Sequence, residues 1–206
     1  MATYKIAVVP GDGVGPEVMD EALKVLAALE KPYPNLRFIL SEHPIGAACY
    51  QKTGTDLPDE TLEACKSNDA VLFGSAGDPN IRFDDGTEIA PQLTLRFLLD
   101  LYAGIRPIKS YPGVTPLLTN DPPIDYVIMR ENTEGLYASR GAGVRVGDEV
   151  AVDNMVITRK GTERIVKFAF EIAQKRNGAP SDGIRRVTCV DKANVLRGFA
   201  LFREIF

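Results

Sequence analysis

Most residues of this sequence that are suited to chemistry come directly after short apolar runs that predict strands. Two of these sites are glycine loops, Gly11-Asp12-Gly13 and Gly74-Ser75-Ala76-Gly77. The others are polar: Arg106, Arg130-Glu131-Asn132 and Asp191-Lys192-Ala193-Asn194. In open α/β sheets, ligands bind outside the carboxyl ends of the strands, and guanidinium groups bind carboxylates through paired hydrogen bonds. The pattern therefore indicates a site for a small anion, most simply a polycarboxylate.

Each of these features also has an ordinary structural interpretation. The loop from Gly11 to Gly15 lacks the G-x-G-x-x-G spacing of dinucleotide-binding proteins, so a structural turn is favoured there. Tyr137 could be a core aromatic, Lys192 alone is evenly balanced between the two interpretations, and His43 is expected to be structural. A single arginine is usually solvated, but three near predicted strand ends favour a carboxylate site: Arg96, Arg106 and Arg130.

The elements that must position these residues alternate along the chain. Short apolar runs predict strands at 5–9, 37–40, 70–73, 103–108, 124–129 and 187–190. Helical patterns begin at Pro16 and cover 59–65, 91–101, 158–176 and 198–206. Strands separated by helices predict an α/β fold with a largely parallel sheet and flanking helices. A domain boundary near residue 100 divides the chain into 1–100 and 101–206.

The segment 139–157 breaks this alternation. It contains Gly141, Gly143 and Gly147, and then the apolar alternation of Val150 and Val152. We interpret it as a β-hairpin arm outside the main sheet, with a long mobile loop as the alternative. Because an isolated hairpin is only marginally stable in water, the arm is expected to pack on something, such as a second subunit.

Composition excludes several classes of protein. The 206 residues are 45% hydrophobic and 25% charged, which is typical of a globular protein. A net charge of −4 argues against a nucleic-acid partner, and no apolar run approaches the roughly 18 residues of a membrane span. The chain enters a strand within five residues, so no secretory signal is expected. The cysteines lack metal-binding spacing and predict buried thiols in a reducing, cytoplasmic compartment: Cys49, Cys65 and Cys189.

Five segments occur in order: PGDGVGPEV (10–18), LFGSAGDP (72–79), LRFLLDLYAGIRP (95–107), RENTEGLY (130–137) and VDKANVL (190–196). Together they resemble the β-decarboxylating dehydrogenases, a family that comprises 3-isopropylmalate, isocitrate, homoisocitrate and tartrate/malate dehydrogenases. The resemblance covers nearly the whole chain. It implies a two-domain α/β fold of that type, with the arm at 139–157 as a clasp between the subunits of a homodimer.

The resemblance also implies an activity, the oxidation of a malate-type 2-hydroxy di- or tricarboxylate followed by loss of its β-carboxylate. NAD or NADP would accept the hydride, and Mg²⁺ or Mn²⁺ would stabilise the developing alkoxide and enolate. Arg96, Arg106 and Arg130 match the arginines that bind the substrate carboxylates.

Three further residues acquire roles from the resemblance. Tyr137 matches the tyrosine that protonates the enol, and Asn194 matches a residue near the nicotinamide. Lys192 matches the lysine, supplied by the partner subunit, that assists deprotonation of the substrate hydroxyl. A lysine serves as a base only when its pKa is lowered, which neighbouring cations achieve.

The choice of substrate depends on the helix before Arg96. Its residues Pro91 to Leu95 lack the serine and asparagine with which common isocitrate enzymes hold a third carboxylate. Leu93 and the segment VDKANVL favour 3-isopropylmalate, whereas Gln92 and RENTEGLY lean toward isocitrate, homoisocitrate or tartrate. We favour 3-isopropylmalate, and the other substrates remain alternatives.

Family chains are much longer than 206 residues. Their metal-binding aspartates and adenosine-binding loop correspond to sequence beyond Phe206, so we assign no metal ligand within residues 1–206 and leave NAD against NADP open. These residues alone are therefore expected to be inactive. A non-catalytic carboxylate-binding or scaffold protein is the alternative of another class.

Overall fold

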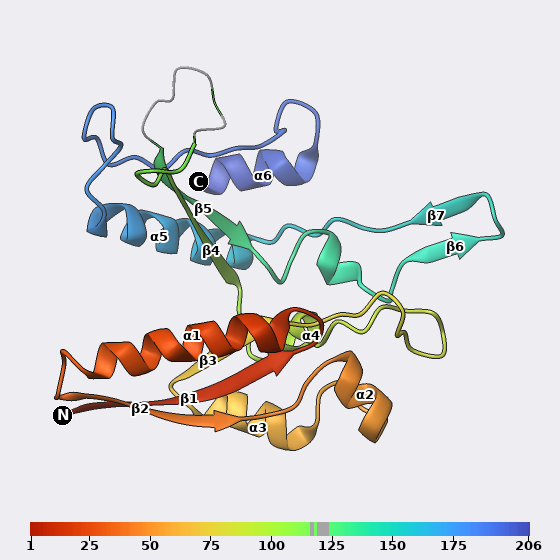
Figure 1. The fold of residues 1–206 in the computed structure, drawn as a ribbon. Coiled ribbons are helices and arrows are strands. Elements are labelled where there is room, and N and C mark those ends of the chain that lie inside the picture. The colour runs from red at the N-terminus through yellow and green to blue at the C-terminus, as the bar shows by residue number, and fades with distance from the viewer. Residues whose placement is uncertain (116–117, 119–123) are drawn as a thin grey trace. The chain divides into compact units, whose positions relative to one another are not determined.

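The computed structural model describes residues 1–115, 118 and 124–206, which divide into two compact units, Met1–Leu99 and Asp100–Phe206 (Figure 1). The sequence predicts a boundary between residues 100 and 101. That the two units are separate domains stays a prediction.

A three-stranded parallel sheet in the order β2-β1-β3 forms the first unit, from β1 (Ala2–Gly11), β2 (Leu36–Glu42) and β3 (Ala70–Ser75). Parallel neighbours need long crossover connections. These are supplied by α1 (Gly15–Glu30), between β1 and β2, and by α2 (Ala47–Thr53) and α3 (Asp59–Ser67), between β2 and β3; α4 (Pro91–Leu98) follows β3. The predicted α/β class, a parallel sheet with flanking helices, is confirmed.

The central strand β1 is buried on both faces over residues 6–9. Val8, 2% exposed, packs with Met19 of α1, whereas Val9, fully buried, packs with Cys65 of α3 and Leu95 of α4. Side chains of successive strand residues point to opposite faces, so a strand with helices on both sides needs an uninterrupted apolar run. This explains the run at residues 5–9 and fixes the glycine loop at its carboxyl end.

The sequence does not predict α2. The helix starts after Gly46, whose φ is +93°, and its first amides donate to the Asp12 carboxylate, with Ala48 N at 2.8 Å from Oδ1. A Cβ at Gly46 would lie 2.1 Å from Asp12 Oδ2. Because its cap comes from a residue far away in sequence, no local signal marks the start of this seven-residue helix.

Close backbone packing explains the glycines of the first loop. A Cβ at Gly11 would lie 1.7 Å from the Ser75 carbonyl oxygen, and one at Gly15 would lie 2.2 Å from the Pro10 carbonyl oxygen. The backbone around Pro10 and Ser75 therefore leaves no room for a side chain at either glycine. This supports a structural turn at residues 11–15.

The second unit contains an antiparallel pair, β4 (Ala103–Lys109) and β5 (Asp125–Glu131). Its helices are the short 3₁₀ helix η1 (Leu136–Ser139), α5 (Arg159–Lys175), which packs on β5, and α6 (Arg197–Ile205), which packs on α5. This pair is antiparallel, unlike the parallel sheet of the first unit. No helical pattern lies between residues 108 and 124, and a parallel pair would need a crossover there.

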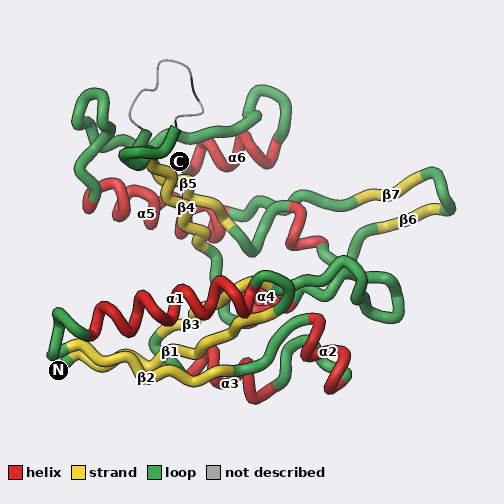
Figure 2. The backbone as a smooth tube through the Cα atoms, in the orientation of Figure 1, coloured by secondary structure: helices red, strands yellow, loops and turns green. Residues whose placement is uncertain are grey.

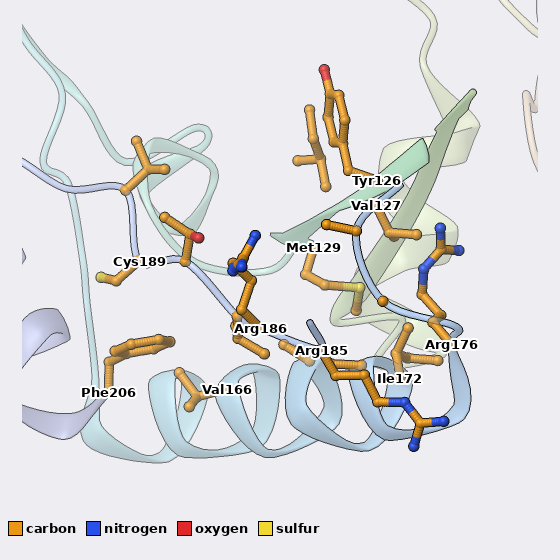
Figure 3. A pocket seen from close by; sticks show the side chains of 18 of the residues that line it. Tyr126, Val127, Met129, Val166, Ile172, Arg176, Arg185, Arg186, Cys189 and Phe206 are labelled. Carbon is orange, nitrogen blue, oxygen red and sulfur yellow. The ribbon is translucent and has the colours of Figure 1, made fainter. Parts of the chain in front are cut away.

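The predicted strand at 187–190 is also wrong, because these residues form no ladder with any described strand. They line a cavity of about 710 Å³ together with β5 and α5, and Cys189 lies near Phe206 on one side of it (Figure 3). Cys189 is consequently half-buried, not buried as predicted, whereas Cys49 and Cys65 are buried. An apolar alternation predicts a strand only where a partner edge is in register with it.

The helix predicted at 158–176 is confirmed. Thr158 is its N-cap and accepts a hydrogen bond from Gly161 N at 3.0 Å. Among residues 1–115, 118 and 124–206, no helix is both long and apolar enough to cross a membrane.

A two-stranded hairpin, β6 (Val144–Val146) and β7 (Val150–Val152), lies within the predicted arm (Figure 2). Val144 pairs with Val152 and Val146 with Val150, so all four valines share one face. They are 46–62% exposed. The hairpin thus presents an apolar face that no other described element covers.

Candidate active site

Two of the predicted carboxylate-binding arginines lie on one face of the β4–β5 ribbon. Gly104 pairs with Arg130, and Arg106 follows Gly104 by two residues. Directly paired residues of an antiparallel ladder share a face, and so do residues two apart on one strand. The opposite face carries the acids Asp125 and Glu131, which pair with Arg176, directly after α5, and with Arg164 of α5. The two arginines therefore lie on one face of the ribbon, and the two carboxylates lie on the other.

Arg130 and Tyr137 are brought together by the turn that follows β5. The Arg130 guanidinium carbon lies 5.3 Å from the centroid of the Tyr137 ring, a cation–π distance. Gly135, with a φ of +72°, permits the reversal that starts η1 and returns Tyr137 toward the strand end. Both side chains are half-buried. A carboxylate bound by Arg130 would thus lie close to the phenol.

The acids of the segment 130–137 hold this turn in place. The Glu131 carboxylate accepts hydrogen bonds from Thr133 N at 2.7 Å and from Thr133 Oγ1 at 2.6 Å, and also from Glu134 N. Glu134 in turn accepts from Thr158 N at 3.0 Å, so it reaches the N-cap of α5. These two acids therefore act on the protein's own backbone, and the segment is tied to α5 at its carboxyl side.

Arg164 of α5, which the sequence reasoning missed, completes the anchor. One of its terminal nitrogens lies 2.8 Å and 2.9 Å from the two Asp100 carboxylate oxygens. The other donates to Glu131 Oε1 at 3.0 Å and to Thr133 Oγ1 at 2.7 Å. Burial opposes its charge, but the bonds to Asp100 and Glu131 outweigh this and raise the pKa of Arg164 above its ordinary value.

A signal for Arg164 existed in the sequence. Arg164 precedes Phe168 by four residues and so lies on the apolar face of the predicted helix. A charged residue in that position requires a buried partner. The guanidinium lies 4.4 Å from the ring centroid of Tyr102, and that ring packs edge-on against Phe168.

The remaining predicted residues lie in other segments. Arg96 is half-buried on α4 of the first unit, and its joint action with Arg106 and Arg130 stays a prediction. Lys192 and Asn194 are exposed on the turn before α6. The described residues contain no group of three or more His, Cys, Asp or Glu side chains that could hold a metal ion.

Asp191 fixes the turn that carries Lys192 and Asn194. Its carboxylate, only 2% exposed, accepts from Ala193 N at 2.7 Å and from Arg203 Nε at 2.8 Å. The hydrogen bonds from Arg203 and from the Ala193 amide lower the pKa of Asp191 to about 2. The ionised carboxylate is therefore the form that holds the turn.

This lowered pKa predicts how the turn responds to acid. Because the pKa is below its ordinary value of 3.8, the stabilisation by Asp191 is complete above about pH 4 and is lost as the pH falls toward 2. We expect Arg203→Met to raise the pKa of Asp191 toward 3.8, measured by ¹³C titration of the carboxyl group. Arg197→Met, on the same helix, is the control. An unchanged Asp191 pKa in Arg203→Met would contradict this assignment.

Comparison with known proteins places these features in context. A family model described as isocitrate/isopropylmalate dehydrogenase matches residues 5–206. The 3-isopropylmalate/3-methylmalate dehydrogenase of Methanocaldococcus jannaschii is 43% identical over 204 residues, covering 98% of this chain and 55% of that protein. The 3-isopropylmalate dehydrogenase of Bifidobacterium longum is 44% identical over 197 residues, covering 94% of this chain and 54% of that protein. The chain thus spans about half the length of the curated relatives it matches.

Solved structures agree with the sequence matches. Isocitrate dehydrogenase from Methylococcus capsulatus superposes with a TM-score of 0.79 at 35% identity, covering 98% of this chain and 55% of that one. A beta-decarboxylating dehydrogenase from Thermococcus kodakarensis, in its apo form, gives a TM-score of 0.71 at 39% identity, covering 98% and 53%.

Proposed function

This chain belongs to the isocitrate/isopropylmalate dehydrogenase family, and from that membership we propose that the protein oxidatively decarboxylates a malate-type 2-hydroxy acid. The observation that carries the proposal is the match to the family over residues 5–206. The arrangement of Arg106, Arg130 and Tyr137 on one unit supports it, because two cations and a phenol are the groups that binding a carboxylate and protonating an enol require.

The proposed substrate is 3-isopropylmalate. Two relatives at 43% and 44% identity carry that name, and Leu93 offers an apolar side chain on the helix before Arg96. One feature favours a more polar substrate such as isocitrate, homoisocitrate or tartrate. Among the described residues, the Gln92 side-chain oxygen is buried without a hydrogen-bond partner. It lies four residues before Arg96, so the two share a face of α4.

We assign the chemical steps to the protein's own residues as follows. Arg96, Arg106 and Arg130 bind and orient the carboxylates, Lys192 from the partner subunit takes the hydroxyl proton, and Tyr137 returns a proton to the enol carbon. Asn194 is proposed to contact the nicotinamide. NAD or NADP accepts the hydride when bound, and Mg²⁺ or Mn²⁺ supplies charge stabilisation. From the resemblance to the family, we propose that the metal ligands come from polypeptide outside residues 1–206.

Steady-state assays of the full-length protein test the proposal. The substrates are 3-isopropylmalate, isocitrate, homoisocitrate and tartrate, each with NAD or NADP and with Mg²⁺ or Mn²⁺. We expect the highest kcat/KM for 3-isopropylmalate, and no turnover by residues 1–206 alone. Carboxylate binding without turnover in any combination would favour the non-catalytic alternative.

The three free cysteines are consistent with a reducing compartment such as the cytoplasm.

We further propose that the β6–β7 hairpin joins two copies of the chain. Its face of four valines is half-exposed, whereas the reverse face carries Arg145 and Ala151. Val146→Asp with Val150→Asp is expected to convert a dimer into a monomer in sedimentation velocity, because the new charges would be buried in the interface. Ala151→Asp, on the reverse face, is the matched control. A dimer that survives the double substitution would place the interface elsewhere.

A further inference from the structure

We propose that Arg164 is a positioning residue, which sets the geometry of Arg130 and Tyr137 in the active site. The proposal rests on the proposed function, because it assigns a cause to the placement of two of its residues. The contacts of Arg164 described above are with Asp100, Glu131 and Thr133 and with the Tyr102 ring. Arg164 acts through the turn at 131–134, which connects the strand that ends in Arg130–Glu131 to the helix that contains Tyr137.

The contacts of Arg164 converge on the end of the β4–β5 ribbon. Ala103 pairs with Glu131, and Asn132 N donates to the Tyr102 carbonyl at 2.8 Å, so the start of β4 lies beside the end of β5. Arg164 donates hydrogen bonds to both chain segments, to Asp100 before β4 and to Glu131 after Arg130. It therefore restrains the ribbon at the end where Arg130 lies.

Asp100 shows that this restraint acts on unusual backbone. Its φ of +47° makes it the one non-glycine residue with a positive φ in the described part of the chain. Such a conformation is uncommon for a residue with a side chain and persists where the surroundings hold it. The two oxygens of Asp100 both contact one nitrogen of Arg164, which fixes the backbone shortly before β4 begins at Ala103.

The shape of the guanidinium matters as well as its charge. Its two terminal nitrogens serve different partners, Asp100 on one side and Glu131 with Thr133 on the other, while its face covers the Tyr102 ring. A lysine ammonium is a point charge and cannot reproduce this planar fork. The Glu131 side chain is 15% exposed against 68% for Asp100, so the Glu131 contact is the better shielded from solvent.

If Arg164 only attached α5 to β5, its replacement would have the same effect as replacement of Arg176. That residue pairs with Asp125, so it joins the same helix to the same strand at the opposite end. Asp125 is the first residue of β5, and Glu131 is the last. Arg176→Lys is therefore a matched control for helix–strand attachment. The two arginines differ in that only Arg164 contacts the turn between Arg130 and Tyr137.

The kinetic test compares Arg164→Lys with Arg176→Lys in the full-length protein. Small displacements of orienting groups have large effects, so we expect Arg164→Lys to raise the substrate KM about tenfold and to lower kcat, with the cofactor KM unchanged. Arg176→Lys should change the substrate KM by less than about twofold even where its Tm falls equally. Equal changes in substrate KM for the two variants, or none for Arg164→Lys, would overturn the proposal.

A spectroscopic test separates this proposal from the proposed function. The Tyr137 ring beneath Arg130 should shift the NMR resonance of the Arg130 Nε–H group. The difference in this resonance between wild type and Tyr137→Leu measures the shift that the ring causes. We expect Arg164→Lys to reduce the shift and Arg176→Lys to leave it unchanged. An unchanged shift in Arg164→Lys overturns the positioning role whatever the protein catalyses. A reduced shift in a protein without dehydrogenase activity supports positioning and overturns the proposed function.

Thr133→Val provides a second variant that leaves no charge unpaired. The Thr133 hydroxyl accepts from Arg164 at 2.7 Å and lies 2.6 Å from Glu131 Oε1, so its removal loosens the same turn. We expect a smaller rise in substrate KM, about threefold, in the same direction as for Arg164→Lys. If Arg164→Lys fails to fold, a Thr133→Val protein with wild-type KM and an unchanged Arg130 resonance would overturn the proposal.

Discussion

Replacing Arg130 with alanine is expected to lower kcat/KM of the full-length enzyme for its substrate at least tenfold. The guanidinium lies on the open face of the ribbon, directly before the turn that α5 anchors. A charge-assisted paired contact with a carboxylate contributes roughly 1.5–3 kcal/mol, which corresponds to a factor of about 10 to 150. The loss should appear mainly in KM, because the carboxylate is bound in the ground state as well as in the transition state.

Lys109→Ala is the matched control for this prediction. Lys109 is an exposed cation on the same ribbon, but its position pairs with Asp125 on the face toward α5. It should change kcat/KM by less than about twofold, since exposed charges contribute little. A wild-type kcat/KM for Arg130→Ala would exclude Arg130 from the site.

Lys192→Met and Tyr137→Phe are expected to fail at different steps. Lys192→Met keeps most of the side-chain stem and removes the base, so hydride transfer itself should fall by about 10²–10⁴. Tyr137→Phe keeps the ring beneath Arg130 and removes only the proton donor. It should still reduce one equivalent of cofactor in a single turnover and then stall before the enol is protonated.

Stopped-flow absorbance of the reduced cofactor separates the two cases. Wild type should show continued turnover, Tyr137→Phe a burst without turnover, and Lys192→Met neither. Lys175→Met, at the end of α5, tests whether loss of a lysine has an effect by itself. A full-size hydride burst from Lys192→Met would show that another group is the base.

Features with a local cause could be predicted from the sequence. Residues 6–9 are apolar because β1 has a helix on each face, and α5 carries its own N-cap in Thr158. The glycine loop could be interpreted as structural because it lacks a nucleotide-binding spacing. The sequence signal of each of these elements lies within a short stretch of the chain.

Features with a distant cause could not be predicted. The cap of α2 is Asp12, and the direction of β5 relative to β4 depends on the pairing of two strands that are separated in the sequence. The apolar alternation at 187–190 signals a strand, but no described strand pairs with it. For the candidate site, residue types indicated which groups bind carboxylates, whereas the Arg164 anchor depends on contacts between segments that only the fold brings together.

The two-faced ribbon restricts which length changes this protein can tolerate. Arg130 and Glu131 are neighbours in the chain and point to opposite faces, one toward the proposed ligand and the other toward α5. One residue inserted within β5 upstream of this pair would reverse the two, so that a carboxylate would face the carboxylate ligand and a guanidinium would face Arg164. Related sequences should therefore vary in length between β4 and β5 and keep the number of residues from Asp125 to Glu131 constant.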